Sequence, residues 1–341
     1  MSKTVKVGIV GLGKMGRIRE REIRSYPGAE LVWGADADEN ACESLSDINV
    51  SQDFRDLVRS DVDAVFVCTP NYITPAVVTE CLDAGKHVFC EKPPGRTIED
   101  IHAIIEAEKR NPNLRLKFGF NHRYHAGIQE AKRLVDSGRF GDILWLRGIY
   151  GKSGGSGFEK EWRSDKQRCG GGILLDQGIH MVDLFRYFCG DFVEVKSMVT
   201  TAYWNIDVED NAFALLRDHE GRVALLHSSS TQWKHRFCLE VYMSEGYLSV
   251  NGILSSTRSY GDETITVARK QLGGGHATGK PREETIYFDT DPSWEREVAE
   301  FFDSILNGAP IVFGTSEQAL KAMQLVCAIY KDDDECAKER G

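Results

Sequence analysis

The sequence predicts an α/β fold in two parts, an N-terminal doubly wound parallel sheet and a C-terminal part with a mostly antiparallel sheet. Three observations lead to this prediction. The first 120 residues alternate between short apolar runs and stretches with helical spacing. Residues 193–288 are instead a series of strand-like runs. The chain has 341 residues, and at roughly 100–200 residues per domain this length favours two domains.

The apolar runs of the N-terminal part are expected to be strands. Each is continuous and bounded by Gly, Asp, Asn or Pro, which is typical of strands buried on both faces of a parallel sheet. These runs are 5–10, 31–35, 64–68, 87–90 and 116–120. Helices are expected between them, over 14–25, 54–59, 75–84 and 97–110. Thr97 with Asp100 is a plausible N-cap pair for the last helix, and Gly85 is a plausible stop for the helix before it.

The C-terminal part has a different pattern. Helices are expected over 125–137 and 174–188, with a strand over 143–150 between them. Further strands include 212–216, 223–228, 237–243 and 264–267. Two helices, 293–306 and about 316–331, close the chain.

Composition excludes several classes of function. The net charge is −10 and no basic stripe is visible, so nucleic acid is not an expected partner. The nine Cys are an odd number without a C-x-x-C pair, which indicates free thiols in a reducing compartment. No Cys/His cluster suggests a metal site, and no apolar stretch of about 18 residues suggests a membrane span. A cytoplasmic location is the default expectation.

A glycine turn follows the first strand and opens the first helix. Gly11, Gly13 and Gly16 have the G-x-G-x-x-G spacing, with Lys14 and Met15 between the last two. Such a turn lets a pyrophosphate approach the free N–H groups at the helix start. Asp36 ends the second strand 20 residues after Gly16, which is the expected distance for a carboxylate on the ribose hydroxyls. This carboxylate would repel a 2′-phosphate, so we expect NAD in preference to NADP.

Polar residues with catalytic potential follow later strands and helices. Asp176 and His180 are four residues apart on an expected helix, after the glycines 170–172. A His in this position suits proton transfer from a substrate hydroxyl, although a helix cap and a packed His explain the same pattern. Lys92 follows the strand 87–90 and could stabilise an alkoxide, or be a surface Lys before a turn. Thr69-Pro70-Asn71 also follows a strand and is either part of the crevice or an ordinary turn.

Together these motifs resemble the Gfo/Idh/MocA family, of the glucose–fructose oxidoreductase and inositol dehydrogenase type. The resemblance rests on the glycine turn, Thr69-Pro70-Asn71, Glu91-Lys92-Pro93 and the segment from Gly170 to His180, in family order. It implies a Rossmann-like dinucleotide-binding domain over 1–122. An α/β domain with a large open sheet, for substrate binding and oligomerisation, would follow over 123–341. The final helix is a candidate to pack back on the first domain.

The resemblance also implies roles for residues. Lys92, Asp176 and His180 would form the catalytic group, with His180 as the base and hydride passing to or from nicotinamide. The cofactor would contact residues of four motifs: Gly11, Gly13, Lys14, Met15, Gly16, Asp36, Thr69, Pro70, Asn71, Glu91 and Lys92. The open sheet would mediate a homodimer or homotetramer.

Three positions depart from the family pattern. Thr74 stands where the family often has a His after the Thr-Pro-Asn motif, and Pro94 stands where Leu or Ile is usual. Arg19 replaces a His often seen three residues after the glycine turn. The first and third departures concern cofactor contacts rather than the catalytic group.

Substrate contacts are expected from several places besides Asp176 and His180. Trp162 and Arg163 precede the glycine triplet, and an Arg there could bind a carboxylate or phosphate, or lie in a surface loop. Trp233 suits a sugar ring or equally a subunit interface. Arg123 and Tyr124 could border the crevice.

These observations favour an oxidoreductase that transfers hydride to or from a hydroxyl carbon of a sugar, inositol or sugar nucleotide. Two alternatives use the same fold: a non-catalytic NAD-sensing regulator, and an NAD-dependent hydrolase or dehydratase that recycles its cofactor in place. The residues do not name the substrate or the direction of hydride transfer.

Overall fold

The computed structural model describes residues 4–43, 45–255, 257–273, 276–277 and 279–340, which form two compact units. The first unit contains the residues up to Asn121, together with 167–170 and 294–323. The second contains 122–166, 171–293 and the residues from Gln324 onward. The long last helix, α10 (Ser316–Arg340), contributes residues to both units and extends beyond the end expected at residue 331.

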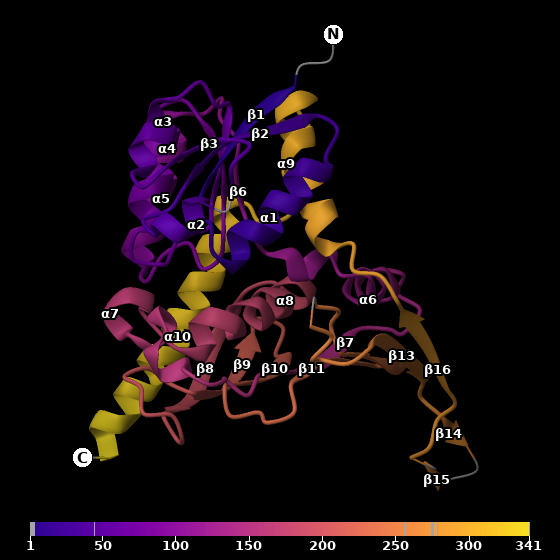
Figure 1. Cartoon of the computed structure of the whole chain (residues 1–341). Coiled ribbons are helices and arrows are strands. Elements are labelled where there is room, and N and C mark those ends of the chain that lie inside the picture. Colours follow the sequence, from indigo (N-terminus) through magenta and orange to yellow (C-terminus); the bar gives the residue numbers. More distant parts are fainter. Residues whose placement is uncertain (1–3, 44, 256, 274–275, 278, 341) are drawn as a thin grey trace. The chain divides into compact units, whose positions relative to one another are not determined.

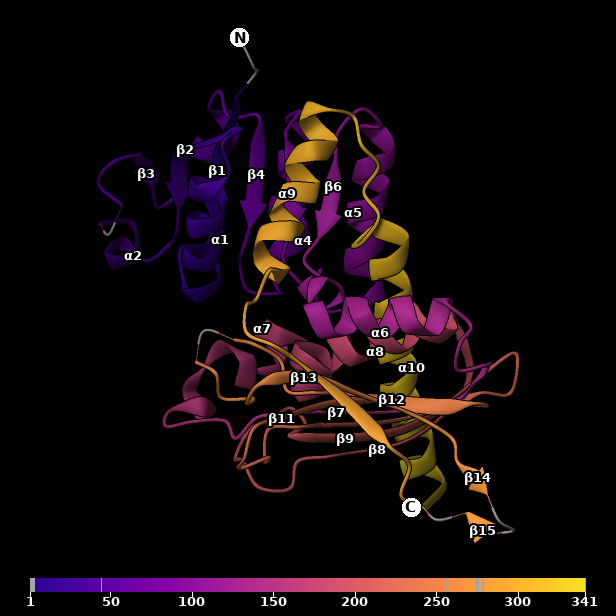
Figure 2. The same cartoon turned by 90° about the vertical axis from the view of Figure 1, so that its right-hand side faces the viewer.

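The first unit is built on a six-stranded sheet whose order is β3-β2-β1-β4-β5-β6 (Figures 1 and 2). Every strand pair in it is parallel. The strands are β1 (Val5–Val10), β2 (Ala29–Ala35), β3 (Asn49–Ser51), β4 (Ala64–Val67), β5 (His87–Cys90) and β6 (Leu116–Phe118). The order reverses between β1 and β4, and ligands of doubly wound sheets bind at the carboxyl ends of the strands at such a point.

Helices connect these strands, as the alternating pattern predicts. They are α1 (Lys14–Ser25), α2 (Glu39–Glu43), α3 (Phe54–Arg59), α4 (Thr74–Asp83) and α5 (Ile98–Arg110). The short helix α7 (Lys166–Cys169) lies later in the chain, and residues 167–169 of it belong to the same unit. Thr97 and Asp100 form the expected capping box at the start of α5. Gly85 has a positive φ just after α4, which is consistent with its role as a helix stop.

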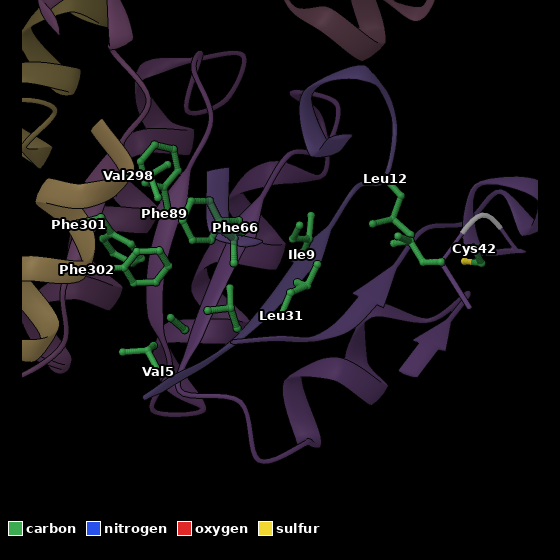
Figure 3. Close-up of a cluster of buried hydrophobic side chains, with 14 residues drawn as sticks. Val5, Ile9, Leu12, Leu31, Cys42, Phe66, Phe89, Val298, Phe301 and Phe302 are labelled. Atoms are coloured by element: carbon green, nitrogen blue, oxygen red, sulfur yellow. The ribbon is translucent and has the colours of Figure 1, made fainter. Parts of the chain in front are cut away.

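The core of the first unit includes a helix from the far end of the chain. Figure 3 shows Phe301 and Phe302 of α9 (Ser293–Leu306) against Phe66 and Phe89, which come from β4 and β5. The Phe66 and Phe89 rings stack at 4.8 Å, and Phe301 meets both rings edge-on at 5.4 and 5.6 Å. Burying each Phe stabilises the fold by roughly 1.5–3 kcal/mol. A segment some 200 residues downstream of β5 therefore completes this core.

The second unit is built on an eight-stranded sheet of order β16-β13-β12-β11-β7-β10-β9-β8. The strands are β7 (Ile143–Gly151), β8 (Phe192–Thr200), β9 (Asn211–Asp218), β10 (Val223–Ser229), β11 (Arg236–Met243), β12 (Gly246–Asn251), β13 (Glu263–Arg269) and β16 (Glu283–Phe288). Strands β7 and β10 pair in parallel, and all other pairs are antiparallel. This confirms the fold class, with a parallel sheet followed by a mostly antiparallel one. A separate two-stranded ribbon joins β14 (Leu272–Gly273) and β15 (His276–Ala277).

One face of the large sheet is covered by helices. In Figure 2, α6 (Ala126–Asp136) and α8 (Ile179–Cys189) lie on the same side of the strands, and α8 contacts β7 and β10. The π-helical turn η4 (Leu174–Gly178) leads directly into α8. Three short 3-10 turns complete the unit: η1 (Asn121–Tyr124), η2 (Phe158–Lys160) and η3 (Trp162–Ser164).

The strands also expose apolar side chains in the second unit. Strand β9 alternates buried and exposed positions, with Phe213 and Leu215 exposed to 43% and 49%. Leu225 of the neighbouring β10 is exposed to 40%. Aromatic side chains pair along the sheet as well, with Trp145 stacked on Tyr242 at 4.0 Å. A contiguous exposed apolar surface of this kind marks a candidate contact surface.

Candidate active site

The glycine turn lies at the point where the strand order of the first sheet reverses. Gly11 follows β1 with φ +94°, and a Cβ there would lie 2.5 Å from the carbonyl oxygen of Cys68, which follows β4. A Cβ at Gly16 would lie 2.0 Å from the Gly11 carbonyl oxygen, so both positions require glycine. A Cβ at Gly13 would meet nothing within 4 Å. The first and third glycines therefore close the turn, and the second leaves space beside it.

This space fits a dinucleotide phosphate. Gly13 is the N-cap of α1, no side chain caps the helix, and its first turn carries no acidic residue. The backbone N–H groups at a helix start bear partial positive charge and bind anions. Lys14 and Met15 lie in this first turn. These features support binding of a pyrophosphate at this turn.

Asp36 directly follows β2, next to the glycine turn. Its carboxylate accepts a hydrogen bond from the Leu12 amide at 2.7 Å and a second from the Asp38 amide at 2.9 Å. Two backbone donors hold the side chain beside the second residue of the Gly11–Gly16 motif. The Asp36 carboxylate is thus held next to the glycine turn by the backbone.

Thr69-Pro70-Asn71 follows β4 at the same edge of the sheet. The Asn71 side-chain amide is buried and donates to the Cys169 carbonyl at 2.7 Å. The Thr69 and Thr74 hydroxyls lie 2.8 Å apart, so Thr74, which replaces the frequent family His, packs within the motif itself. Asn71 therefore anchors the residue just before the glycine triplet.

A buried charge cluster includes Glu91, the residue before Lys92. Arg19 of α1 is fully buried and forms ion pairs of 2.6 Å with Glu91, the residue before Lys92, and with Glu297 of α9. Its guanidinium also lies over the rings of Phe89 and Trp294, at 4.3 and 4.7 Å. Arg19, which stands where the family often has a His, thus links α1 to the residue after β5 and to α9.

Burial shifts the pKa values of Glu297 and of the nearby Lys117. Desolvation raises the pKa of Glu297 to about 7, although Arg19 and Lys117 act to lower it. Lys117 is itself buried, and its ammonium donates to Glu300 at 2.8 Å and to the Phe313 carbonyl at 2.6 Å. Desolvation lowers the pKa of Lys117. Arg19 thus pairs with two buried carboxylates of the first unit, and Lys117 pairs with the Glu300 carboxylate.

Each glycine of the triplet is required by a close contact with protein. A Cβ at Gly170 would meet the Arg96 side chain at 2.5 Å, and one at Gly171 would meet the Tyr330 hydroxyl at 2.3 Å. A Cβ at Gly172 would lie 2.1 Å from the Glu209 carbonyl oxygen. The triplet thus permits close packing against other parts of the protein.

Glu209 holds the segment that carries Asp176. Its buried carboxylate accepts hydrogen bonds from the Gly172 and Leu174 amides at 2.8 and 2.9 Å, and from the Tyr330 hydroxyl at 2.8 Å. Burial raises the pKa of this carboxyl, and the donors oppose that shift. The start of the π-helical turn is therefore fixed by a side chain 35 residues further along the chain.

Asp176 lies in the turn η4, where two cations approach it. Lys152, just after β7, donates to its Oδ2 atom at 2.9 Å. The Nε atom of Arg163 lies 3.5 Å from its Oδ1 atom. Asp176 and Arg163, each expected separately to contact substrate, are thus brought together, and Lys152 joins them. π-helical turns are rare and frequent at functional sites.

His180 lies one turn further along, on α8, and is buried with 4% exposure. The ring of His122 stacks on it, with centroids 3.7 Å apart and planes inclined by 20°. The Nε2 atom of His122 lies 3.1 Å from the hydroxyl of Tyr150, whose pKa burial raises well above the ordinary value. Packing against the His122 ring thereby orients the His180 imidazole.

The other expected substrate residues lie in different surroundings. Arg123 is buried and makes a bidentate ion pair with Asp183, at 2.8 and 2.6 Å, and Tyr124 is also buried. Trp162 carries the Arg163 guanidinium over its ring at 4.4 Å. Trp233 is 61% exposed and packs against Tyr203 at 4.9 Å.

Within the second unit the structure brings Arg163 to Asp176, and His180 lies one turn further along the chain, while Lys92 belongs to the first unit. Sequence reasoning missed Lys152, His122 and Glu209. An isolated Lys, His or Glu has no spacing signal, because its partners are distant in the chain. The described residues contain no group of three or more His, Cys, Asp or Glu arranged to hold a metal ion. None of the described helices combines the length and apolar character needed to cross a membrane.

Two family models match this chain. Residues 5–120 match the model described as an oxidoreductase family with an NAD-binding Rossmann fold. Residues 128–249 match the GFO/IDH/MocA C-terminal domain. Together the two matches cover more than half of the chain, and each falls mainly in a different structural unit.

Named relatives agree with this match. The chain is 28% identical to a myo-inositol 2-dehydrogenase of Thermotoga maritima, over 76% of this chain and 79% of that protein. It is 25% identical to an inositol 2-dehydrogenase of Rhizobium meliloti, over 96% of each chain. Among solved structures, levoglucosan dehydrogenase in complex with NADH superposes with a TM-score of 0.85 at 22% identity, covering 98% of each chain. At that identity the superposition establishes the fold.

The glycine turn with its open helix start, the Asp36 carboxylate beside it and the two family matches agree with one another. The chain therefore belongs to the GFO/IDH/MocA family and is an oxidoreductase with an NAD-binding Rossmann domain.

Proposed function

We propose that the protein transfers a hydride between NAD and a hydroxyl-bearing carbon of a sugar, inositol or sugar nucleotide. In the oxidative direction the substrate hydroxyl gives its proton to His180 and the carbon gives its hydride to the nicotinamide ring. The substrate hydroxyl thereby becomes a carbonyl group, and the reverse reaction returns the proton and the hydride to it. The observation that carries this proposal is the buried His180 ring, fixed by the stacked His122 one turn beyond Asp176.

Asp176 and Lys92 complete the proposed catalytic group. Asp176 binds substrate hydroxyls, and the Lys92 ammonium stabilises the negative charge that develops on the reacting oxygen. Trp162, Arg163, Arg123, Tyr124 and Trp233 remain candidate substrate contacts. Relatives named for inositol and levoglucosan support a polyol or sugar as substrate.

The first unit holds the cofactor in this proposal. The N–H groups at Gly13, Lys14, Met15 and Gly16 bind the pyrophosphate, and Gly11 shapes the turn. Asp36 accepts hydrogen bonds from the ribose hydroxyls and repels the extra phosphate of NADP. Other contacts are proposed for Thr69, Pro70, Asn71, Glu91 and Lys92.

In this proposal the domain over 1–122 binds the cofactor, and the domain over 123–341 binds the substrate and mediates oligomerisation. The chain forms a homodimer or homotetramer through its open sheet. The exposed Phe213, Leu215 and Leu225 support this arrangement, because a contiguous apolar surface is stabilised by burial in an interface. Light scattering of the wild-type protein and of a Leu215→Lys variant measures the assembly. We expect the wild type to have at least twice the monomer mass and the variant a smaller mass.

The test of the catalytic proposal is NAD reduction with a panel of polyols, sugars and sugar nucleotides. We expect reduced nicotinamide to form with at least one member and the rate to fall by about 100-fold or more in His180→Ala. His219→Ala is the matched control, because His219 is exposed in a turn of the second unit. Full activity of His180→Ala would remove the assigned role.

The same experiment separates the two alternatives. Turnover with no net change in nicotinamide would indicate a hydrolase or dehydratase that recycles the cofactor. Binding of NAD with no turnover, together with NAD-dependent binding of a partner protein, would indicate a regulator.

A further inference from the structure

Two cationic side chains converge on one carboxylate at the proposed substrate site. Lys152 Nζ lies 2.9 Å from one oxygen of Asp176, and Arg163 Nε lies 3.5 Å from the other. All three residues belong to the second unit, where they come from the end of β7, from η3 and from η4. A carboxylate balances one of the two positive charges, so this group of three carries an excess positive charge.

Both cations keep donors that the described protein does not use. Among the described residues, Asp176 is the hydrogen-bond acceptor of the Lys152 ammonium, which has three donors. Arg163 makes an ion pair with Asp176, and no hydrogen bond joins its guanidinium to another part of the described chain. The side chains of Lys152 and Arg163 are 20% and 36% exposed. A ligand can therefore reach them.

The nearby His235 and the composition of the local sequence agree with this excess. His235, linked to Ser153 by a 3.0 Å hydrogen bond, has its pKa lowered by burial and further by Lys152, so it adds no charge at neutral pH. The surrounding stretch 151–168 contains five Lys or Arg and three Asp or Glu. This local excess contrasts with a net charge of −10 for the whole chain.

A purely structural role does not require this arrangement. One Lys is enough to pair with Asp176, and a partly exposed ion pair contributes only about 0–1 kcal/mol to stability. The Arg163 guanidinium also lies over the Trp162 ring, which restricts its position. A guanidinium that is restricted in this way and has free terminal N–H groups is suited to bidentate binding of an oxyanion.

We propose that the substrate is an anionic polyol, a sugar or inositol that carries a carboxylate or phosphate group. Lys152 and Arg163 bind the anionic group, and Asp176 fixes both cations in place. The inference rests on the proposed function, because it names the class of substrate for the same site. Lys152 and Arg163 are thus specificity residues, and neither takes part in hydride transfer.

Equilibrium binding to the NADH-loaded protein tests the proposal without requiring the physiological substrate. The probes are glucose, glucuronate and glucose 6-phosphate, with galactose, galacturonate and galactose 6-phosphate as a second set, each measured by calorimetry. In at least one set we expect an anionic member to bind about tenfold tighter than the neutral sugar or better. The preference should shrink as salt is raised, because the cations are partly exposed. The carboxylate and phosphate members identify the preferred anion.

Variants assign the preference to the two cations. Lys152→Met and Arg163→Gln should each reduce the ratio of anionic to neutral affinity by about tenfold. Lys160→Met, which removes an exposed cation of the same loop, should leave that ratio within about twofold. Equal binding of neutral and anionic sugars, no measurable preference in either set, or a preference that survives both variants would overturn the inference.

The outcomes also distinguish this inference from the proposed function. Reduction of NAD by neutral polyols, without an anion preference, would refute the anionic substrate class and leave hydride transfer intact. Binding of anionic sugars without NAD reduction by any alcohol would refute the proposed function.

Discussion

Arg19 provides a quantitative test of the buried charge cluster that includes Glu91. Replacing it by Met keeps an unbranched side chain against the Phe89 ring but removes the cation from two buried ion pairs. Glu91 and Glu297 would then be buried without their common partner. Removing one member of a buried pair costs about 3–5 kcal/mol, because the remaining charge is uncompensated. We expect a loss of this size in the free energy of unfolding at pH 8.

The loss should depend on pH. With a pKa of about 7, Glu297 is largely protonated at pH 5 in the folded protein, so less charge is left uncompensated there. Arg19→Met should therefore cost less at pH 5 than at pH 8. Adding Glu297→Gln removes one of the two stranded carboxylates and should restore part of the stability at pH 8.

Urea unfolding, followed by circular dichroism and tryptophan fluorescence at both pH values, measures these differences. Arg24→Met is the matched control, because Arg24 lies on the same helix and pairs with Asp47 while 37% exposed. It should cost less than about 1 kcal/mol. An Arg19→Met loss no larger than that of the control at pH 8 would refute the reasoning.

Three further predictions concern single positions. The pKa of Glu297 is about 7 in the folded protein and 4.5 in the unfolded chain, so ionisation of this carboxyl destabilises the folded protein. The free energy of unfolding should therefore fall by up to about 3 kcal/mol between pH 4.5 and 7 because of this group. Unfolding titrations of Glu297→Gln should show a smaller decline. Gly172→Ala places a Cβ 2.1 Å from the Glu209 carbonyl oxygen and should lower the thermal midpoint by several degrees, whereas Gly155→Ala, with nothing within 4 Å, should change it little; equal midpoints would contradict the close contact. Asp36→Ala should raise the KM for NAD by about tenfold and reduce the preference for NAD over NADP in initial-rate assays; an unchanged preference would show that this carboxylate does not select the cofactor.

The sequence predicts those features that depend on local patterns. The strands around Phe66 and Phe89 are continuous apolar runs, and the glycine motif stands between an apolar run and a stretch with helical spacing, which is the context of a dinucleotide-binding turn. Asp176 and His180 could be proposed as one site because residues four apart on a helix share a face. Each of these features could be predicted because its residues follow a pattern that is visible within about twenty positions of the sequence.

Features that depend on distant contacts could not be predicted in the same way. The apolar spacing around Phe301 predicts an amphipathic helix over 293–306. This spacing does not show whether the helix packs on the first sheet or on the second. Glu209 binds mainly backbone amides, which every residue possesses, so no partner residue marks it in the sequence. Lys152 and Asp176 are 24 positions apart, and only the fold shows that they meet.

The central claim is that hydride leaves the hydroxyl-bearing carbon of a polyol and reaches NAD, with His180 taking the proton. The most direct measurement uses a substrate deuterated at that carbon and determines the mass of the reduced nicotinamide by mass spectrometry. The account predicts that NADH gains one deuterium with the wild type and His219→Ala, and that His180→Ala forms this product about 100-fold more slowly or worse. Unlabelled NADH from the deuterated substrate, or labelled NADH formed at the full rate by His180→Ala, would contradict it.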